Sequence, residues 1–110
     1  MKIAIPLAEG KLTAHFGHCQ TFALVDVQDK KITQINELEP PPHEPGVLPR
    51  WLHEQEVSHV IAGGLGNRAQ KLLKDQGITV MVGAPEAEAK ELVQRYLNGT
   101  LMLGKNSCSH

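Results

Sequence analysis

The residues best suited to metal chemistry lie in one short segment, His15-Phe16-Gly17-His18-Cys19. Neutral imidazole and thiolate are the usual protein ligands of zinc, copper and iron clusters. On a helical turn, His15, His18 and Cys19 would share one face because they stand three and four residues apart, and Gly17 would let the backbone approach a bulky ligand. The segment predicts a metal site. The alternative is a polar loop with solvated histidines, in which Cys19 is only a small buried hydrophobe.

A glycine-rich segment, Gly63-Gly64-Leu65-Gly66-Asn67, follows an apolar run and precedes a helical pattern. Its partial match to the dinucleotide fingerprint does not predict NAD binding, since the chain lacks room for two mononucleotide halves. Amides at a helix N-terminus, together with the helix dipole, attract anions. The segment therefore predicts a cradle for a carboxylate, a phosphate or an anionic metal cluster. The alternative is a tight turn that needs glycine for packing.

Other histidines and the second cysteine are separate candidates. His43 stands in a proline-rich surface loop and would act as a third donor or a lid; the alternative is an exposed loop histidine. Cys108 and His110 form a second ligand pair near the C-terminus, and eleven extended residues span roughly 36 Å. The alternative is a disordered tail. His53 and His59 are predicted to be structural or solvated.

Five strands and three helices are predicted to position these residues. The strands are expected at Lys2–Leu7, Thr21–Val27, Ile32–Leu38, Val57–Ala62 and Ile78–Val82, and the helices at Val47–Gln55, at Asn67–Gln76 and from Gly83-Ala84-Pro85-Glu86 to Asn98. The order βββαβαβα predicts a three-layer α/β fold with a mixed five-stranded sheet in the order 3-2-1-4-5. The carboxyl ends of its parallel strands are the expected binding edge.

Three local expectations accompany this topology. Pro6 removes a ladder donor, which predicts a bulge or an unpaired position in the first strand. The apolar residues of Ile32–Leu38 do not alternate cleanly, which predicts an edge strand or a bulge. Ala8–Gln20 is expected to be a polar loop, and Glu86 and Glu88 are expected in the first turn of the last helix.

Length and composition bound the function. The chain has 110 residues, which predicts one domain at residues 1–99 and a flexible tail at residues 100–110. A net charge of -1 argues against a general basic field for nucleic acid. No apolar run approaches the ~20 residues of a membrane span, and the N-terminus reads as a strand, so a cytoplasmic protein is expected. No Walker motif, nucleophile elbow or carboxylate pair indicates catalysis, so no enzyme is expected.

Four segments in order, Lys2–Pro6, His15–Gly17, Val60–Gly66 and Gly77–Val80, resemble the dinitrogenase iron–molybdenum cofactor biosynthesis family over roughly residues 1–99. The resemblance implies a ribonuclease-H-like sheet without nuclease activity. It also implies binding of metal clusters or their precursors, or of a molybdenum–copper sulfide cluster as in relatives. The family histidine carries over to His15 and the family glycine loop to Gly63, Gly64 and Gly66. His18, Cys19 and the Cys-x-His tail depart from the family pattern.

The leading hypothesis is a non-enzymatic carrier of an iron–molybdenum or other metal–sulfur cluster, with cluster-assembly or acceptor proteins as partners. The cofactor-binding candidates are His15, Phe16, Gly17, His43, Gly63, Gly64, Gly66 and Asn67, and the metal ligands are His15, His18 and Cys19. One alternative is a metal-independent regulatory module that binds an anionic metabolite at the Gly63–Gly66 loop. The other is a simple zinc or copper protein.

Overall fold

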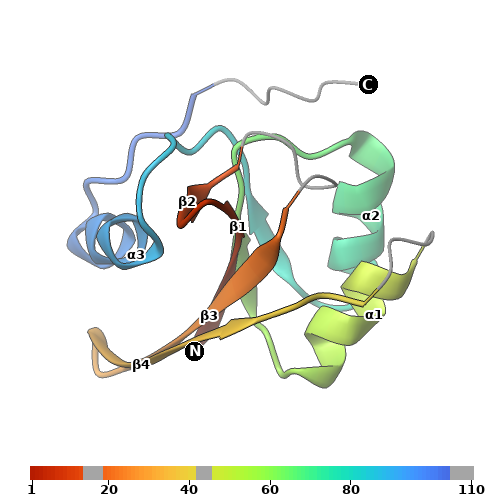
Figure 1. Ribbon diagram of the computed structural model, residues 1–110, viewed down its shortest axis with the longest axis horizontal. Coiled ribbons are helices and arrows are strands. Elements are labelled where there is room, and N and C mark those ends of the chain that lie inside the picture. The colour runs from red at the N-terminus through yellow and green to blue at the C-terminus, as the bar shows by residue number, and fades with distance from the viewer. Residues whose placement is uncertain (14–18, 42–45, 105–110) are drawn as a thin grey trace.

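One mixed sheet with helices on both faces forms the protein (Figure 1). The computed structural model describes residues 1–13, 19–41 and 46–104. The elements in chain order are β1 (Lys2–Ala8), β2 (Lys11–Leu12), β3 (Thr21–Gln28), β4 (Lys31–Leu38), α1 (Val47–Glu54), β5 (His59–Ile61), α2 (Asn67–Asp75), β6 (Thr79–Met81) and α3 (Ala89–Asn98). In the described ranges, no helix is long and apolar enough to cross a membrane.

The main strands lie in the order β4-β3-β1-β5-β6, and β2 pairs with β1. The β1–β3 and β3–β4 pairs are antiparallel, whereas the β1–β5 and β5–β6 pairs are parallel. The predicted α/β class is confirmed, and the five predicted strands occupy these positions. Because β1 and β5 are parallel neighbours, the chain segments that leave them emerge at the same edge of the sheet.

The sheet has a sixth strand that the sequence analysis missed. Residues 8–20 were expected to form a polar loop, but Ala8 still belongs to β1 and Leu12 pairs with Leu7. Glu9 and Gly10 adopt φ values of 54° and 83°, which turn the chain back on itself. The turn returns Leu12 to the sheet, where its side chain is 2% exposed and contributes to the core.

The last helix begins later than predicted. Residues 83–88 precede α3, and Glu88 is its N-cap residue with extended backbone angles. The amide of Leu12 donates a hydrogen bond of 3.0 Å to the carbonyl of Ala87, which holds the connection against β2. The prediction that Glu86 and Glu88 lie in the first turn is therefore wrong; Glu91 is the acidic residue there.

Pro6 does not interrupt β1. It pairs with Phe22 in an unbroken register, so the predicted bulge or unpaired position is wrong. The Pro6 carbonyl accepts a hydrogen bond from the amide of Thr13, at 3.1 Å. Since the nitrogen and oxygen of a strand residue face the same side, the proline nitrogen also points away from β3. The β1–β3 ladder therefore requires no donor from Pro6.

Alternation along the strands builds a hydrophobic core on each face of the sheet. Ala4, Phe22 and Leu24 pack with residues of α1 and α2, including Leu52 and Leu73. The opposite face carries the alternate strand residues, with Leu92 and Val93 of α3. The members of this second core that come from β1 and β3 are Ile3, Ile5, Leu7, Ala23, Val25 and Val27. The three layers follow from the two-residue period of strand side chains.

Candidate functional site

The loops that follow β5 and β6 are joined beyond the ends of their strands. The amide of Gly83 donates to the carbonyl of Gly63 at 3.0 Å, and the amide of Ala84 donates to the carbonyl of Ala62 at 3.1 Å. Both loops lie at the carboxyl edge of the parallel strands, which was the predicted binding edge. These backbone hydrogen bonds hold the two glycine-containing loops side by side without using a side chain.

The loop after β5 leads directly into α2, whose N-cap residue is Gly66 with φ −64° and ψ 156°. No side chain caps this helix end, and its first turn contains no acidic residue. Gly63 and Gly64 are buried, whereas Asn67 is exposed. On the loop, the Gln70 side-chain amide donates to the carbonyl of Leu65 at 2.9 Å, which fixes the approach to the helix.

The position of Gly66 is open in the described part of the chain. A Cβ added there would meet no heavy atom within 4 Å, and its φ is one that any residue adopts. Packing therefore does not explain a glycine at this position, which weakens the tight-turn interpretation for Gly66. A helix N-terminus without a side-chain cap at its N-cap residue is suited to receive an anion.

The chain returns to this edge after α3. The amide of Gly104 donates a hydrogen bond of 2.7 Å to the carbonyl of Gly83, and Leu101 packs against the core beneath α3. Gly83 has φ 82°, and a Cβ there would collide with the backbone of Gly104. Sequence reasoning missed this contact, although two glycines at the meeting point were its visible signal. Cys108 and His110 lie outside the described residues, and the flexible tail from residue 100 stays a prediction.

Cys19 lies in the core on the α1 and α2 side, with a side chain that is 8% exposed. Burial raises the pKa of its thiol to about 11, with a smaller opposing effect from a backbone hydrogen bond. The thiol therefore keeps its proton at neutral pH, while metal ligation uses the thiolate. In this conformation Cys19 serves as a core residue, and its predicted role as a ligand stays a prediction.

The other predicted ligands, His15, Phe16, Gly17, His18 and His43, lie outside the described residues. Within residues 1–13, 19–41 and 46–104, no group of three His, Cys, Asp or Glu side chains could hold a metal ion.

The two described histidines lie away from the glycine loops. His53 is exposed near the end of α1. His59 begins β5 at the opposite edge of the sheet, with its Nδ1 2.7 Å from the Ser58 hydroxyl. Burial lowers its pKa, and the positive N-terminus adds to this effect.

Comparison with known proteins supplies the family. A family model described as "Dinitrogenase iron-molybdenum cofactor" matches residues 1–99. The chain belongs to this family. The family implied by the sequence motifs is thus confirmed.

Relatives in sequence and in structure resemble this chain over most of its length. An uncharacterized protein of Methanocaldococcus jannaschii is 28% identical over 106 residues, which cover 92% of this chain and 89% of that protein. The crystal structure of a protein designated PH0822 superposes with a TM-score of 0.87 at 25% identity, covering 94% of each chain. The apo form of the orange protein from Desulfovibrio gigas has a TM-score of 0.75 at 21% identity, covering 96% of this chain and 93% of that one, and shows a shared fold.

Proposed function

We propose that this protein binds and carries an anionic metal–sulfur cluster, either the iron–molybdenum cofactor, a precursor or a related cluster, without catalysing a reaction. The site is the carboxyl edge of β1, β5 and β6. Family membership supports a cofactor-related role. The observation that carries the proposal is the N-terminus of α2, which has no side-chain cap at Gly66 and follows the joined glycine loops.

The described residues on either side of the histidine segment support the same edge. Residues 14–18 connect Thr13 to Cys19, and both flanks of this segment are attached to the end of β1. The amide of Thr13 bonds to the carbonyl of Pro6, and the amide of Gln20 bonds to the carbonyl of Leu7 at 2.7 Å. We infer that the histidine ligands bind at this edge, because both described flanks of their segment are attached there.

The role of each group in binding the cluster follows from its chemistry. Imidazole of His15, assisted by His18, would coordinate a metal of the cluster, since neutral imidazole suits iron and copper. The backbone amides and dipole of α2 would stabilise the negative charge of the cluster. The sulfide ligands arrive with the cargo, so the buried thiol of Cys19 is not required. Cluster-assembly or acceptor proteins would be the partners.

The test is anaerobic purification followed by elemental analysis and absorption spectroscopy of the wild type, His15→Ala and Gly66→Leu. We expect stoichiometric metal with a sulfur charge-transfer band, lost in both variants. His53→Ala is the matched control, since this exposed histidine lies on α1 away from the loops. Cluster binding that survives both site variants, or that is lost equally in the control, would contradict the proposal.

The N-terminus of α2, taken without the histidine ligands, favours a second function. An anionic metabolite would bind at Gly66 without metal, through the backbone amides and the dipole at the start of α2. Thermal stabilisation of metal-free protein by phosphate or a carboxylate, lost in Gly66→Leu and retained in His15→Ala, would support it. Uptake of zinc or copper without sulfide, lost in His15→Ala, would instead indicate the simple metal protein.

A further inference from the structure

Strand β4 forms an edge of the sheet, since only β3 pairs with it in the described residues. The register shifts once, at Asp26 and Val27, where Thr33 is the extra residue and donates its hydroxyl to the carbonyl of Asp26 at 3.2 Å. The predicted edge strand and bulge are both confirmed. Residues 34–38 beyond the bulge pair regularly with β3.

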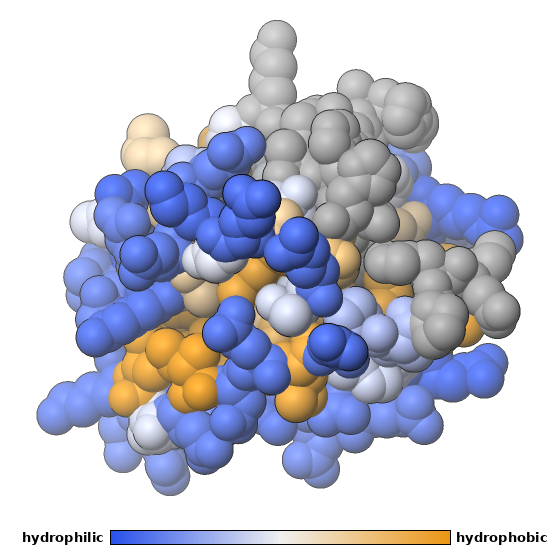
Figure 2. All heavy atoms as spheres, viewed as in Figure 1, coloured by the Kyte–Doolittle hydropathy of each residue, from blue (hydrophilic) through white to orange (hydrophobic). Residues whose placement is uncertain are grey.

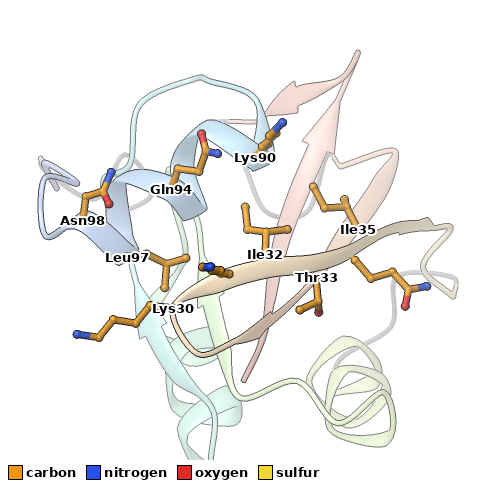
Figure 3. Close-up of a pocket in the computed structure, with 10 residues that line it drawn as sticks. Lys30, Ile32, Thr33, Ile35, Lys90, Gln94, Leu97 and Asn98 are labelled. Atoms are coloured by element: carbon orange, nitrogen blue, oxygen red, sulfur yellow. The ribbon is translucent and has the colours of Figure 1, made fainter.

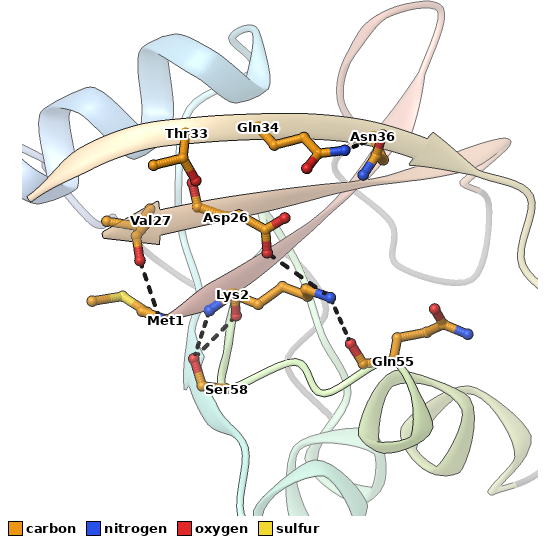
Figure 4. Close-up of polar contacts among 9 residues, drawn as sticks. All are labelled: Met1, Lys2, Asp26, Val27, Thr33, Gln34, Asn36, Gln55 and Ser58. Atoms are coloured by element: carbon orange, nitrogen blue, oxygen red, sulfur yellow. Dashed lines mark hydrogen bonds and ion pairs between the residues drawn. The ribbon is translucent and has the colours of Figure 1, made fainter. Parts of the chain in front are cut away.

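The ladder shows which backbone groups of β4 face outward. Val27 exchanges two hydrogen bonds with Met1, its amide donating to the Met1 carbonyl and its carbonyl accepting from the N-terminus (Figure 4). Antiparallel ladders alternate with a two-residue period, so Val25 also directs its backbone groups to β1. Ile35, opposite Val25, therefore directs its own N–H and C=O away from β3 and toward the free edge.

A groove runs beside this edge, between β4 and α3, with a volume of about 800 Å³. Ile32, Ile35 and Leu97 supply its apolar part (Figure 3). Ile35 is 39% exposed, one of few large apolar side chains so exposed in the described residues. Apolar surface is visible among polar side chains on this side of the molecule (Figure 2).

The charges along the edge have opposite signs at its two ends. Lys30 and Lys31 stand at the start of β4, whereas Glu37 and Glu39 stand at and just beyond its end. All four side chains are exposed, and within the described part of the chain none of them forms an ion pair. A strand with one basic end and one acidic end is complementary to an antiparallel copy of itself.

We propose that β4 pairs antiparallel with β4 of a second copy of this chain, with Ile35 opposite Ile35 of the partner copy. In this register the outward N–H and C=O of the two Ile35 residues form a mutual pair of hydrogen bonds. The basic start of β4, at Lys30 and Lys31, then lies beside the acidic end of the other copy, at Glu37 and Glu39, on each side of the two-fold axis. The two isoleucines face the same side of the extended sheet, beside the two α3 grooves.

A second copy fits better than an acidic extended segment of another protein. Such a segment would match Lys30 and Lys31 at one end of the groove. At the other end it would meet Glu37 and Glu39, and like charges directly opposite in a sheet are destabilising. Only a strand whose charges reverse along its length satisfies both ends, and an isologous interface supplies that strand.

Sedimentation equilibrium of the full chain up to about 1 mM tests the proposal, because weak edge contacts have high dissociation constants. We expect a monomer–dimer equilibrium. Ile35→Pro should raise the dimer dissociation constant by about tenfold or more, since it removes an outward N–H that the β3 ladder does not use. Circular dichroism checks that this variant keeps its fold. Met102→Lys, at an exposed apolar residue outside β4, should leave association unchanged.

Charge reversal tests the antiparallel arrangement without a proline. Lys31→Glu and Glu39→Lys should each weaken the dimer, and the double variant should restore it, because the substituted residues at the adjoining strand ends then again carry opposite charges. A protein that stays monomeric throughout overturns the proposal. A folded Ile35→Pro variant that still dimerises, or a double variant no better than the singles, also overturns it.

Discussion

At the scale of single residues, Cys19 shows how position changes chemistry. The sequence places a thiol beside two histidines, which favours metal ligation, but the fold turns this thiol into the core. Burial excludes water from the sulfur and disfavours the charged thiolate. The same residue type thus has opposite roles according to where the chain directs its side chain.

The Cys19 thiol predicts a loss of stability at high pH. Its folded pKa of about 11 exceeds the ordinary value of 9.0, so folding favours the protonated form. This contribution is fully present below pH 9 and is lost as pH rises toward 11. Urea unfolding of Cys108→Ser at pH 8 and pH 10.5 measures it, and the added variant Cys19→Ala should show a smaller decrease. An equal decrease in both would contradict the assignment.

Alanine substitutions at Gly83 and Gly66 form a matched pair that tests the contact between Gly83 and Gly104. Gly83→Ala should lower the free energy of unfolding by about 1–3 kcal/mol, because the new Cβ strains a left-handed backbone and meets Gly104. Gly66→Ala should cost less than about 1 kcal/mol, since its Cβ enters open space. Chemical denaturation of the two variants measures both losses of unfolding free energy. Similar losses would show that the contact with Gly104 is absent in solution.

At the scale of elements, the segment after α3 forms part of the edge that carries the candidate site. Leu101 and Gly104 attach it to the core and to the loop after β6. The carboxyl edge is therefore assembled from segments that are far apart in the sequence.

Truncation tests this attachment. A chain that ends at Gly104 should be as stable as the full chain, whereas a chain that ends at Gly99 should lose about 1–2 kcal/mol through the lost packing and hydrogen bond. Thermal and urea unfolding of the two truncated chains measure the difference. Equal stability would instead support a tail that is flexible from residue 100.

At the scale of the whole molecule, the sheet joins two cores into one cooperative unit. Ile3, Ile5 and Ala4 of the same strand belong to different faces, so neither core forms without β1. The helices cannot bury their apolar faces until the sheet is in place.

This arrangement predicts that damage to either core destabilises the whole protein. Leu52→Ala, in α1, and Leu92→Ala, in α3, should each cost about 2–5 kcal/mol, since both side chains are fully buried. Each variant should unfold in a single transition by both circular dichroism and tryptophan fluorescence. Two separate transitions would show that the layers fold independently.

The elements whose patterns are local could be predicted from the amino-acid sequence. Alternating or continuous apolar residues predicted β1, β3 and β5, and the glycines after β5 marked the start of α2. The charge and composition bounded the class of protein, and the ordered motifs identified the family. Each of these signals depends on neighbouring residues, so no tertiary information was needed.

The remaining features depend on contacts between residues that are distant in sequence. β2 forms because Leu12 packs in the core and its amide donates a hydrogen bond to the Ala87 carbonyl. The same hydrogen bond holds the segment before α3 against β2, so α3 begins later than predicted. The burial of Cys19 in the core and the hydrogen bond from Gly104 to Gly83 also depend on partners that are distant in sequence. A short strand, a helix start or a thiol pKa is set by the partner that the fold provides, and local sequence does not contain that partner.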